Sequence, residues 1–377
     1  MKTRFALNSF RFRLSSEFKS HDGRPVLLVR GANSYRSSGA EALVQSVVSN
    51  QELVEWAEFS PNPSIEELRV GLDIARELKP SLILGIGGGS AMDLAKMISA
   101  LWERHDGDEV RVALEGETLD SRSSRLVLLP TTSGSGGEAT HFAVLYVDGK
   151  KYSLAGPALL PDLAIVDWRL TQSATPVQKA NSGIDALCQA IESTWAQRAS
   201  NRSRRLAHKA IGMIAPSLEE FVRHNSSGSA RRMSKGSNLA GQAINISQTT
   251  ASHALAYKLT SHFSVPHGNA VGLTIGALMD FLQNESSRLE VYQRKLLHRQ
   301  IRTIRARLRF DSSETATMGF RKLLGSLGLP ETLRAAGVME QSDIELLADS
   351  VNPQRLANNP VPLSRPDIIQ ILEMSWN

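Results

Sequence analysis

The segment SLILGIGGGSAMDLAKMISAL at 81–101 constrains the fold more than any other part of the chain, because an apolar strand, three consecutive glycines and a helix follow directly on one another. A strand that turns at once into a helix is the repeating unit of a parallel α/β sheet. Similar units surround it: the strand-like runs PVLLVR and LVEWAEF alternate with helix-period segments, and RLVLLP precedes a second glycine-rich turn. This alternation predicts a parallel sheet in the first half of the chain.

Signals at helix ends and strand edges refine this prediction. Helices are expected to begin at Ser38 and at Ser64, and the second is the better marked, because Glu67 completes a capping box with Ser64. That helix is expected to end at Lys79, before a proline. The first eighteen residues, MKTRFALNSFRFRLSSEF, alternate arginine with apolar residues and predict a first strand, whose free edge is expected to pair two chains into a homodimer.

The pattern changes near Pro176, beyond which helical periodicity repeats and few strand candidates remain. One such helix has an apolar stripe between arginines, made by Leu297, Ile301, Ile304 and Leu308. Its basic face is interpreted as a solvated helix surface rather than a nucleic-acid-binding surface. We therefore expect an α/β domain over 1–175 and an α-helical domain over 176–377.

The composition limits the classes of function. The chain has 41% hydrophobic and 21% charged residues, and no apolar stretch approaches the roughly eighteen residues of a membrane span, so we expect a soluble protein. Its net charge of +5 is spread along the chain, which argues against nucleic acid or a membrane surface as a partner. The single cysteine, Cys188, forms no internal disulfide, and the N-terminal residues do not match a secretory signal, so we expect a cytoplasmic location.

The two glycine-rich turns are candidate phosphate-binding sites. Gly87, Gly88 and Gly89, followed by Ser90, place bare backbone N–H groups at the start of a helix, where a pyrophosphate binds favourably. Their spacing is not that of the dinucleotide fingerprint, so a simple tight turn stays an alternative for this motif taken alone. The second loop, at 131–137, combines hydroxyl groups with glycines after a strand end. Two such loops together favour a dinucleotide site.

The segments GIGGGSAMDLAK and LPTTSGSGGE resemble the signature segments of the group III, iron-containing alcohol dehydrogenases, and the similarity runs from about Pro25 to about Leu282. The resemblance implies a Rossmann-like nucleotide-binding domain and a helical metal-binding domain, as in dehydroquinate synthase. It also implies that the first segment holds the dinucleotide pyrophosphate and that the second wraps the nicotinamide side. The cofactor-binding residues expected on this basis are Gly31, Gly87, Gly88, Gly89, Ser90, Thr131, Thr132, Ser135 and Lys151.

The end of the PVLLVR strand bears on the choice of cofactor. An acidic residue there would hydrogen-bond the adenosine ribose and repel a 2′-phosphate, but the chain reads RGANS at 30–34. This stretch is similar to that of family members that use NADPH, and Arg30 or Arg36 is expected to pair with the additional phosphate. We therefore expect NADP as the preferred cofactor, with NAD as the alternative.

A candidate metal site lies in the second half of the chain. Asp185 and Gln189 are four residues apart in NSGIDALCQAIES and therefore share one helix face. Pro266 is expected to end one helix and open the next, so that His253 and His267 approach the same point from two elements.

These segments also resemble the group III dehydrogenases, in which an Asp, a His four residues later and two further His bind the metal. The resemblance implies that Asp185, His253 and His267 bind Fe²⁺ or Zn²⁺. Gln189 stands where the commonest family form has histidine, and a neutral amide is a poorer ligand for either cation than imidazole. Gln189 is therefore expected to be either a fourth ligand or a substrate-positioning residue.

The expected chemistry is reduction of a carbonyl group. A bound cation polarises the carbonyl oxygen, the nicotinamide delivers hydride to its carbon, and His262 and Tyr257 are candidate proton donors. The stretch INISQTTASHALAYKLTSHFSVPHG resembles the phosphonoacetaldehyde reductases of phosphonate biosynthesis, which implies reduction of phosphonoacetaldehyde to 2-hydroxyethylphosphonate. Candidate groups for binding the phosphonate are Lys258, His262, Ser261 and Arg198.

Three other functions stay open at this point. A reductase acting on a keto acid such as phosphonopyruvate shares every motif. A dehydroquinate-synthase-like lyase uses similar glycine turns and a metal but returns the hydride within one turnover. A nucleotide-binding protein that lost catalysis when Gln189 replaced histidine need not retain stoichiometric metal.

Overall fold

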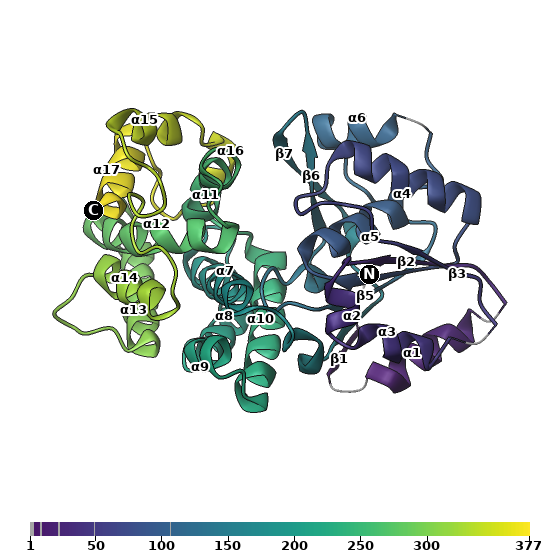
Figure 1. The fold of residues 1–377 in the computed structure, drawn as a ribbon. Helices are drawn as coiled ribbons and strands as arrows, with labels where there is room; N and C mark the ends of the chain where they lie inside the picture. The colour runs from purple at the N-terminus through teal and green to yellow at the C-terminus, as the bar shows by residue number, and fades with distance from the viewer. Residues whose placement is uncertain (1–3, 8–9, 22, 49, 106) are drawn as a thin grey trace. The chain divides into compact units, whose positions relative to one another are not determined.

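The computed structural model describes residues 4–7, 10–21, 23–48, 50–105 and 107–377, and the chain divides into two compact units, Met1–Ala174 and Thr175–Asn377. In Figure 1 the first unit runs from purple to teal and the second from teal to yellow. The first unit is α/β and the second is helical. The fold class expected from the sequence is thereby confirmed.

The first unit is built on a six-stranded sheet in the order β1-β8-β5-β4-β2-β3, with parallel pairing between its strands. These strands are β1 Arg4–Leu7, β2 Val26–Arg30, β3 Leu53–Trp56, β4 Leu82–Gly87, β5 Arg125–Pro130 and β8 Leu163–Val166. A separate antiparallel pair is formed by β6 Phe142–Val147 and β7 Lys150–Ala155. Because β4 and β5 are parallel neighbours, the two glycine-rich turns that follow them start from the same edge of the sheet.

Both faces of this sheet are buried. The helices of the unit are α1 Phe10–Ser20, α2 Ser34–Ser37, α3 Ala40–Gln45, α4 Ile65–Leu78, α5 Gly89–Leu101 and α6 Asp108–Glu115. Along β2, Leu27 belongs to a core that contains residues of α4 and α5, whereas Leu28 belongs to a second core with residues of α1, α2 and α3. Successive strand residues point to opposite faces, so a strand covered on both sides is apolar throughout. This explains the continuous apolar run in PVLLVR.

The prediction for the N-terminal residues is wrong beyond Leu7. The strand ends there and α1 begins at Phe10, while residues 1–3 and 8–9 lie outside the described part of the chain. Leu14 and Phe18 are four residues apart and completely buried, so a helix places both side chains on one face, against the sheet. The alternation of arginine and apolar residues concealed this helical spacing.

The structure contains both of the next two predicted helices, but only one of them begins where it was expected. The helix expected from Ser38 begins two residues later, as α3 at Ala40, because Gly39 adopts a left-handed backbone conformation (φ 79°) that separates α2 from α3. The helix expected from Ser64 is confirmed as α4. Ser64 accepts a hydrogen bond from the Glu67 backbone, the Glu67 side chain completes the capping box, and Lys79 ends the helix with a positive φ.

The regular secondary structure described in the second unit is helical. Its helices are α7 Pro176–Trp195, α8 Asn201–Ile214, α9 Leu218–Arg223, α10 Ser227–Ser247, α11 Ala251–Phe263, α12 His267–Asn284, α13 Val291–Leu308, α14 Ala316–Ser326, α15 Gln341–Asp349, α16 Pro353–Leu356 and α17 Arg365–Trp376. Across the described residues, no helix combines the length and the apolar character that a membrane span needs.

Helices α7 and α12 approach each other closely. A Cβ atom built on Gly268, the second residue of α12, would lie 1.9 Å from the backbone oxygen of Asn181 on α7. The Asn181 side chain also accepts a hydrogen bond from the backbone N–H of Asn269 (3.2 Å). This contact fixes the N-terminus of α12, and therefore His267, against α7.

Candidate functional site

The two glycine-rich turns of the first unit lie against each other. The backbone N–H of Thr131 donates to the carbonyl oxygen of Gly87 (2.9 Å), which joins the ends of β4 and β5. A Cβ atom built on Gly88 would lie 3.7 Å from Thr132 Cγ2. Among the residues that the structure describes, the buried hydroxyl of Thr131 has no hydrogen-bond partner, although an unpaired buried hydroxyl is costly. An oxygen-rich ligand between the turns would satisfy it.

The N-terminus of α5 adds a favourable site for an anion. The helix begins at Gly89, and its N-cap residue Gly88 provides no side-chain cap for the first N–H groups. A Cβ atom on Gly89 would lie 3.6 Å from Ser135 Oγ, which brings the second turn to this helix end. Ser90 instead uses its hydroxyl to accept a hydrogen bond from the Asn62 backbone (3.1 Å). These residues fit the pyrophosphate of a dinucleotide.

Gly31 lies beside the first glycine-rich turn. Its backbone N–H donates to Ile86 (3.0 Å), and a Cβ atom at this position would lie 2.2 Å from Ser34 Oγ and 3.9 Å from the Cα of Gly87. A larger residue would therefore require the Ser34 side chain to move, while its contact with Gly87 would be an ordinary one.

The arginines expected near the adenosine ribose are both paired with acids. Arg30 Nε donates to Glu55 on the neighbouring strand β3 (2.7 Å), and its guanidinium lies over the Tyr35 ring (5.1 Å). Arg36 is largely exposed and pairs with Glu41 (3.1 Å). The sequence analysis missed Glu55, because only the parallel pairing of β2 with β3 brings this carboxylate to the end of β2.

A buried lysine connects α5 to the start of β6. Lys96 is completely buried and donates to Thr140 Oγ1 and to the Phe142 backbone oxygen, both at 2.9 Å. Burial lowers the pKa of Lys96 to about 8, and burial raises the pKa of Asp93 to about 6 against the opposing charges of Lys96 and Lys151. The structure therefore places Lys151 on β7, where its charge acts on Asp93.

In the second unit, three predicted metal ligands come together. One oxygen of Asp185 and one ring nitrogen each of His253 and His267 all lie within 4.8 Å of one another. These side chains come from α7, α11 and α12, because α11 ends at Phe263 and α12 begins just after Pro266. A carboxylate and two imidazoles form a donor set that suits Zn²⁺ or Fe²⁺.

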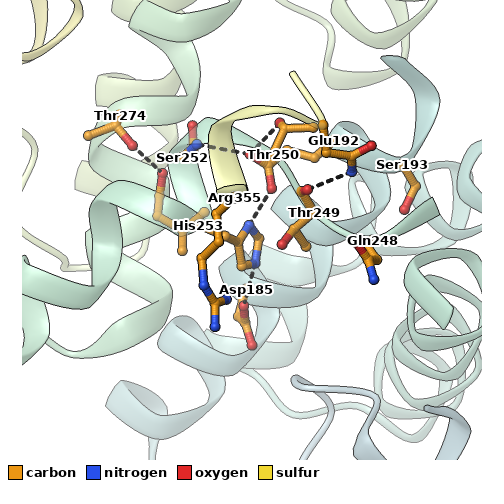
Figure 2. A network of polar contacts seen from close by, with 12 residues as sticks. Asp185, Glu192, Ser193, Gln248, Thr249, Thr250, Ser252, His253, Thr274 and Arg355 are labelled. Carbon is orange, nitrogen blue, oxygen red and sulfur yellow. Dashed lines mark hydrogen bonds and ion pairs between the residues drawn. The ribbon is translucent and has the colours of Figure 1, made fainter. Parts of the chain in front are cut away.

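Glu192 orients His253, and the sequence analysis missed it. The Nδ1 atom of His253 donates to Glu192, which is fully buried, and Nε2 lies 3.3 Å from an Asp185 oxygen (Figure 2). Glu192 also accepts hydrogen bonds from the Thr250 hydroxyl (2.7 Å) and the Ser252 backbone (3.0 Å). A carboxylate on Nδ1 fixes the ring and leaves Nε2 to bind a cation. The available signal was the spacing, since Glu192 is seven residues after Asp185 on one helix.

The electrostatics of this cluster favour positive charge. Burial lowers the pKa of His253, but the charge of Glu192 and hydrogen bonds to Glu192 and Asp185 together raise it to about 9. Burial raises the pKa of Glu192, yet the charge and hydrogen bond of His253 bring it below its usual value. A cation that binds His253 must therefore displace a proton, which makes its affinity dependent on pH.

Gln189 lies one turn beyond Asp185 on α7. Its side chain is 5% exposed, and Oε1 has no hydrogen-bond partner in the described part of the chain. An unsatisfied buried acceptor costs about 1–3 kcal/mol. A cation held by Asp185 would offset this cost, so the residues present fit a bound metal.

The two candidate proton donors have different positions. The Tyr257 ring is stacked with that of His267, with centroids 6.2 Å apart and planes 9° apart. Burial raises the pKa of Tyr257 against the opposing charge of Arg355. His262 is exposed and contacts Phe263. It is nine residues after His253, half a rotation around an α-helix, so the structure does not bring it to the cluster.

The residues expected to bind an anionic substrate group are mostly exposed. Ser261 and His262 point to the surface, Lys258 is half-buried, and Arg198 is exposed and donates to Gln248 (2.6 Å). Arg355, which the sequence analysis did not consider, is the cation that contacts the cluster, through Tyr257. Tyr257 and Arg355 are far apart in the chain, so no local sequence pattern connects them.

Two family models match the chain: iron-containing alcohol dehydrogenase over residues 8–168, and the C-terminal model of the Fe-containing alcohol dehydrogenase family over residues 179–376. Long-chain-alcohol dehydrogenase 1 of Geobacillus thermodenitrificans is 33% identical over 329 residues, covering 85% of this chain and 81% of that protein. The 1-propanol dehydrogenase PduQ of Salmonella typhimurium is 31% identical over 284 residues, covering 72% of this chain and 73% of that protein.

Solved structures share the fold. The iron-containing alcohol dehydrogenase from Thermococcus thioreducens superposes with a TM-score of 0.86 at 26% identity, covering 100% of this chain and 98% of that chain. The sulfoacetaldehyde reductase from Bifidobacterium kashiwanohense, solved with NAD⁺, has a TM-score of 0.84 at 24% identity, covering 99% of this chain and 96% of that chain. The family models span most of both units, so this chain belongs to the iron-containing alcohol dehydrogenase family and is an oxidoreductase.

Proposed function

We propose that this oxidoreductase reduces a small, anionic aldehyde to a primary alcohol, using NADPH and a divalent cation. The observation that supports this most strongly is the cluster of Asp185, His253 and His267, whose ligand atoms lie within 4.8 Å of one another. The first unit adds the joined glycine turns and the uncapped N-terminus of α5, which suit a dinucleotide.

The reaction assigns separate tasks to these residues. When bound, the cation draws electron density from the carbonyl oxygen and the nicotinamide supplies hydride to the carbonyl carbon. Asp185, His253 and His267 hold the cation, and Glu192 fixes the His253 ring through Nδ1. Tyr257, stacked with His267, is the proposed donor of the proton that completes the alcohol.

The best candidate substrate is phosphonoacetaldehyde, which the residue pattern around His253 suggests. The test follows net NADPH oxidation by the metal-loaded protein with phosphonoacetaldehyde, phosphonopyruvate and propanal. We expect net oxidation, with phosphonoacetaldehyde preferred. A preference for phosphonopyruvate would support the keto acid alternative. If none of the carbonyl compounds caused net oxidation of NADPH, the reductase proposal would be wrong. That result would favour a lyase, which returns its hydride.

The acid beside Arg30 predicts how the cofactor preference can be shifted. Glu55→Gln removes the carboxylate that pairs with Arg30 and leaves the guanidinium free for a 2′-phosphate. We expect the ratio of kcat/KM for NADPH to that for NADH to rise by about tenfold, equivalent to about 1.4 kcal/mol. The matched control is Glu41→Gln, which frees Arg36 instead. A larger rise in the control would show that Arg36, not Arg30, binds the phosphate.

The role of Gln189 is tested by restoring the family's commoner ligand. Gln189→His places imidazole where a neutral amide now has an unpaired Oε1. We expect Zn²⁺ affinity to rise by about tenfold or more, because imidazole is the better ligand for this cation. Calorimetric titration of metal-free protein measures this, with Gln189→Ala as the control that loses the amide oxygen. Equal affinities in all three proteins would show that position 189 does not reach the cation.

We also propose a homodimer paired through β1, which ends the sheet order and leaves one edge unpaired within the described sheet. Light scattering on the purified protein measures the mass of the particle. A monomer at micromolar concentration would rule this proposal out.

A further inference from the structure

Arg355 is a cation without an acidic partner near the metal ligands. It lies on α16 and is half-buried, with its guanidinium carbon 4.4 Å from the centroid of the Tyr257 ring. One of its N–H groups donates to the Tyr257 hydroxyl. Within the described part of the chain, no ion pair with a carboxylate is formed by Arg355, whereas the half-buried Arg30 and Arg125 each have one.

Tyr257 connects this arginine to the cluster. Its ring is stacked with His267, and the His267 and His253 ring centroids are 5.7 Å apart. Figure 2 shows the Arg355 side chain together with those of His253 and Asp185. Arg355 is therefore linked to the metal ligand His267 through one aromatic side chain, that of Tyr257.

The segment that carries Arg355 is anchored in place. Asn358, three residues further on, is buried and donates hydrogen bonds to the backbone oxygens of Ser247 and Thr249, both at 2.8 Å. These oxygens lie just before the N-terminus of α11, the helix of His253 and Tyr257. A guanidinium held by such a segment keeps a defined position, which a receptor for a ligand requires.

Guanidinium chemistry indicates what Arg355 is able to bind. It has five N–H donors in a planar fork, and the contact with the Tyr257 hydroxyl uses one. Forked donors suit the oxygen pairs of phosphonate and sulfonate groups, with which they form two parallel hydrogen bonds. A half-buried cation without a counter-ion is also incompletely compensated, and an anion would complete it.

We propose that Arg355 binds the tetrahedral oxyanion of the aldehyde substrate, a phosphonate or sulfonate, while the cation at Asp185, His253 and His267 takes the carbonyl oxygen. The inference rests on the proposed function and names the residue that selects its substrate. In a two-carbon aldehyde the anionic group and the carbonyl group are on adjacent carbons. On this proposal such a molecule uses both binding groups, whereas a neutral aldehyde engages only the metal.

The test compares anionic with neutral aldehydes in Arg355 variants of the whole protein. For wild type, Arg355→Gln and Arg355→Lys, kcat/KM is measured with NADPH and phosphonoacetaldehyde, sulfoacetaldehyde or propanal. In Arg355→Gln, we expect the kcat/KM for phosphonoacetaldehyde divided by that for propanal to fall by about 30-fold or more. The fall is expected mainly through KM, as for loss of one partner of a desolvated charge pair. Arg355→Lys is expected to keep part of the ratio, because it retains the charge but not the fork.

A binding measurement checks the same inference without turnover. Calorimetric titration with methylphosphonate, which has the oxyanion but no carbonyl group, is expected to show at least about tenfold weaker binding in Arg355→Gln than in wild type. The matched control is Arg365→Gln, which removes an exposed arginine from a surface ion pair with Asp349 and is expected to leave both readouts unchanged. Thermal unfolding shows whether each variant is folded. If Arg355→Gln is unfolded, the same measurements on Arg355→Lys test the inference.

The possible results separate the two proposals. An unchanged substrate ratio and unchanged methylphosphonate affinity in folded Arg355 variants would overturn the role of Arg355. Equal wild-type efficiency with propanal and phosphonoacetaldehyde would also overturn it, and would leave aldehyde reduction standing. No reduction of any aldehyde by the metal-loaded wild type, with methylphosphonate still bound through Arg355, would reject the proposed reaction but support the anion site.

Discussion

Replacing His253 with alanine is expected to remove stoichiometric metal from the protein and to lower aldehyde reduction by about 10²- to 10³-fold or more. His253 supplies one of three clustered ligand atoms, so its loss leaves Asp185 and His267 as a two-residue site. It also leaves Glu192, which is completely buried, without the imidazole that compensates its charge. Breaking a buried charge pair in this way costs about 3–5 kcal/mol. Metal analysis and thermal unfolding measure the two effects.

A milder variant separates loss of metal from loss of fold. Glu192→Gln keeps an oxygen that accepts the hydrogen bond from His253 Nδ1 but removes the negative charge. Changes at such supporting residues weaken metal binding by about 10–100-fold. His262→Ala is the matched control, because His262 is exposed on the far side of α11, and it is expected to retain the metal. If His253→Ala kept stoichiometric metal, the cluster would not be the metal site.

Among glycine-to-alanine changes in the second unit, Gly268→Ala is expected to lower stability and metal binding the most. The new Cβ would lie 1.9 Å from the backbone oxygen of Asn181, so α12 must move away from α7. Forcing extra atoms into a close-packed contact costs about 1–3 kcal/mol, and a backbone oxygen yields less than a flexible side chain. The displacement moves His267 relative to Asp185, so we expect weaker metal binding as well as a lower unfolding temperature.

The control for this variant is another glycine-to-alanine change in a helix. Gly228 is exposed in the first turn of α10, and a Cβ atom there would meet only Ser226 Oγ, at 3.9 Å. Gly228→Ala is expected to leave metal binding unchanged and to stabilise the protein slightly, by about 0.4–1 kcal/mol, because alanine restricts the unfolded chain. Equal metal affinity in the two variants would contradict the proposed link between α7–α12 packing and the metal ligands.

Local signals in the sequence were sufficient for several parts of the site. The capping box of Ser64 and Glu67 predicted the start of α4, because it acts within one helical turn. The three glycines after an apolar strand predicted the β4–α5 turn. Pro266 predicted the break between the helices of His253 and His267. Each of these signals depends on residues that are neighbours in the chain.

The same local reasoning failed where a residue's environment was set by distant packing. Arginine and apolar residues alternate near the N-terminus like those of a strand, yet Leu14 and Phe18 are buried together as on a helix. His262 shares a segment with the metal ligands, but helical rotation turns it to the surface. In both cases the decisive quantity was the direction of a side chain, which sequence proximity does not give.

By itself the sequence determined the α/β and helical halves and the glycine turns, because periodicity, capping and short spacings are local properties. Its resemblance to a known family supplied Asp185, His253 and His267 as candidate ligands. Only the tertiary structure decided which charges support the site. Glu192 and His253 are 61 residues apart, and Tyr257 and Arg355 are 98 residues apart. Such pairs form because helices pack to bury their apolar faces, and packing sets which polar groups meet.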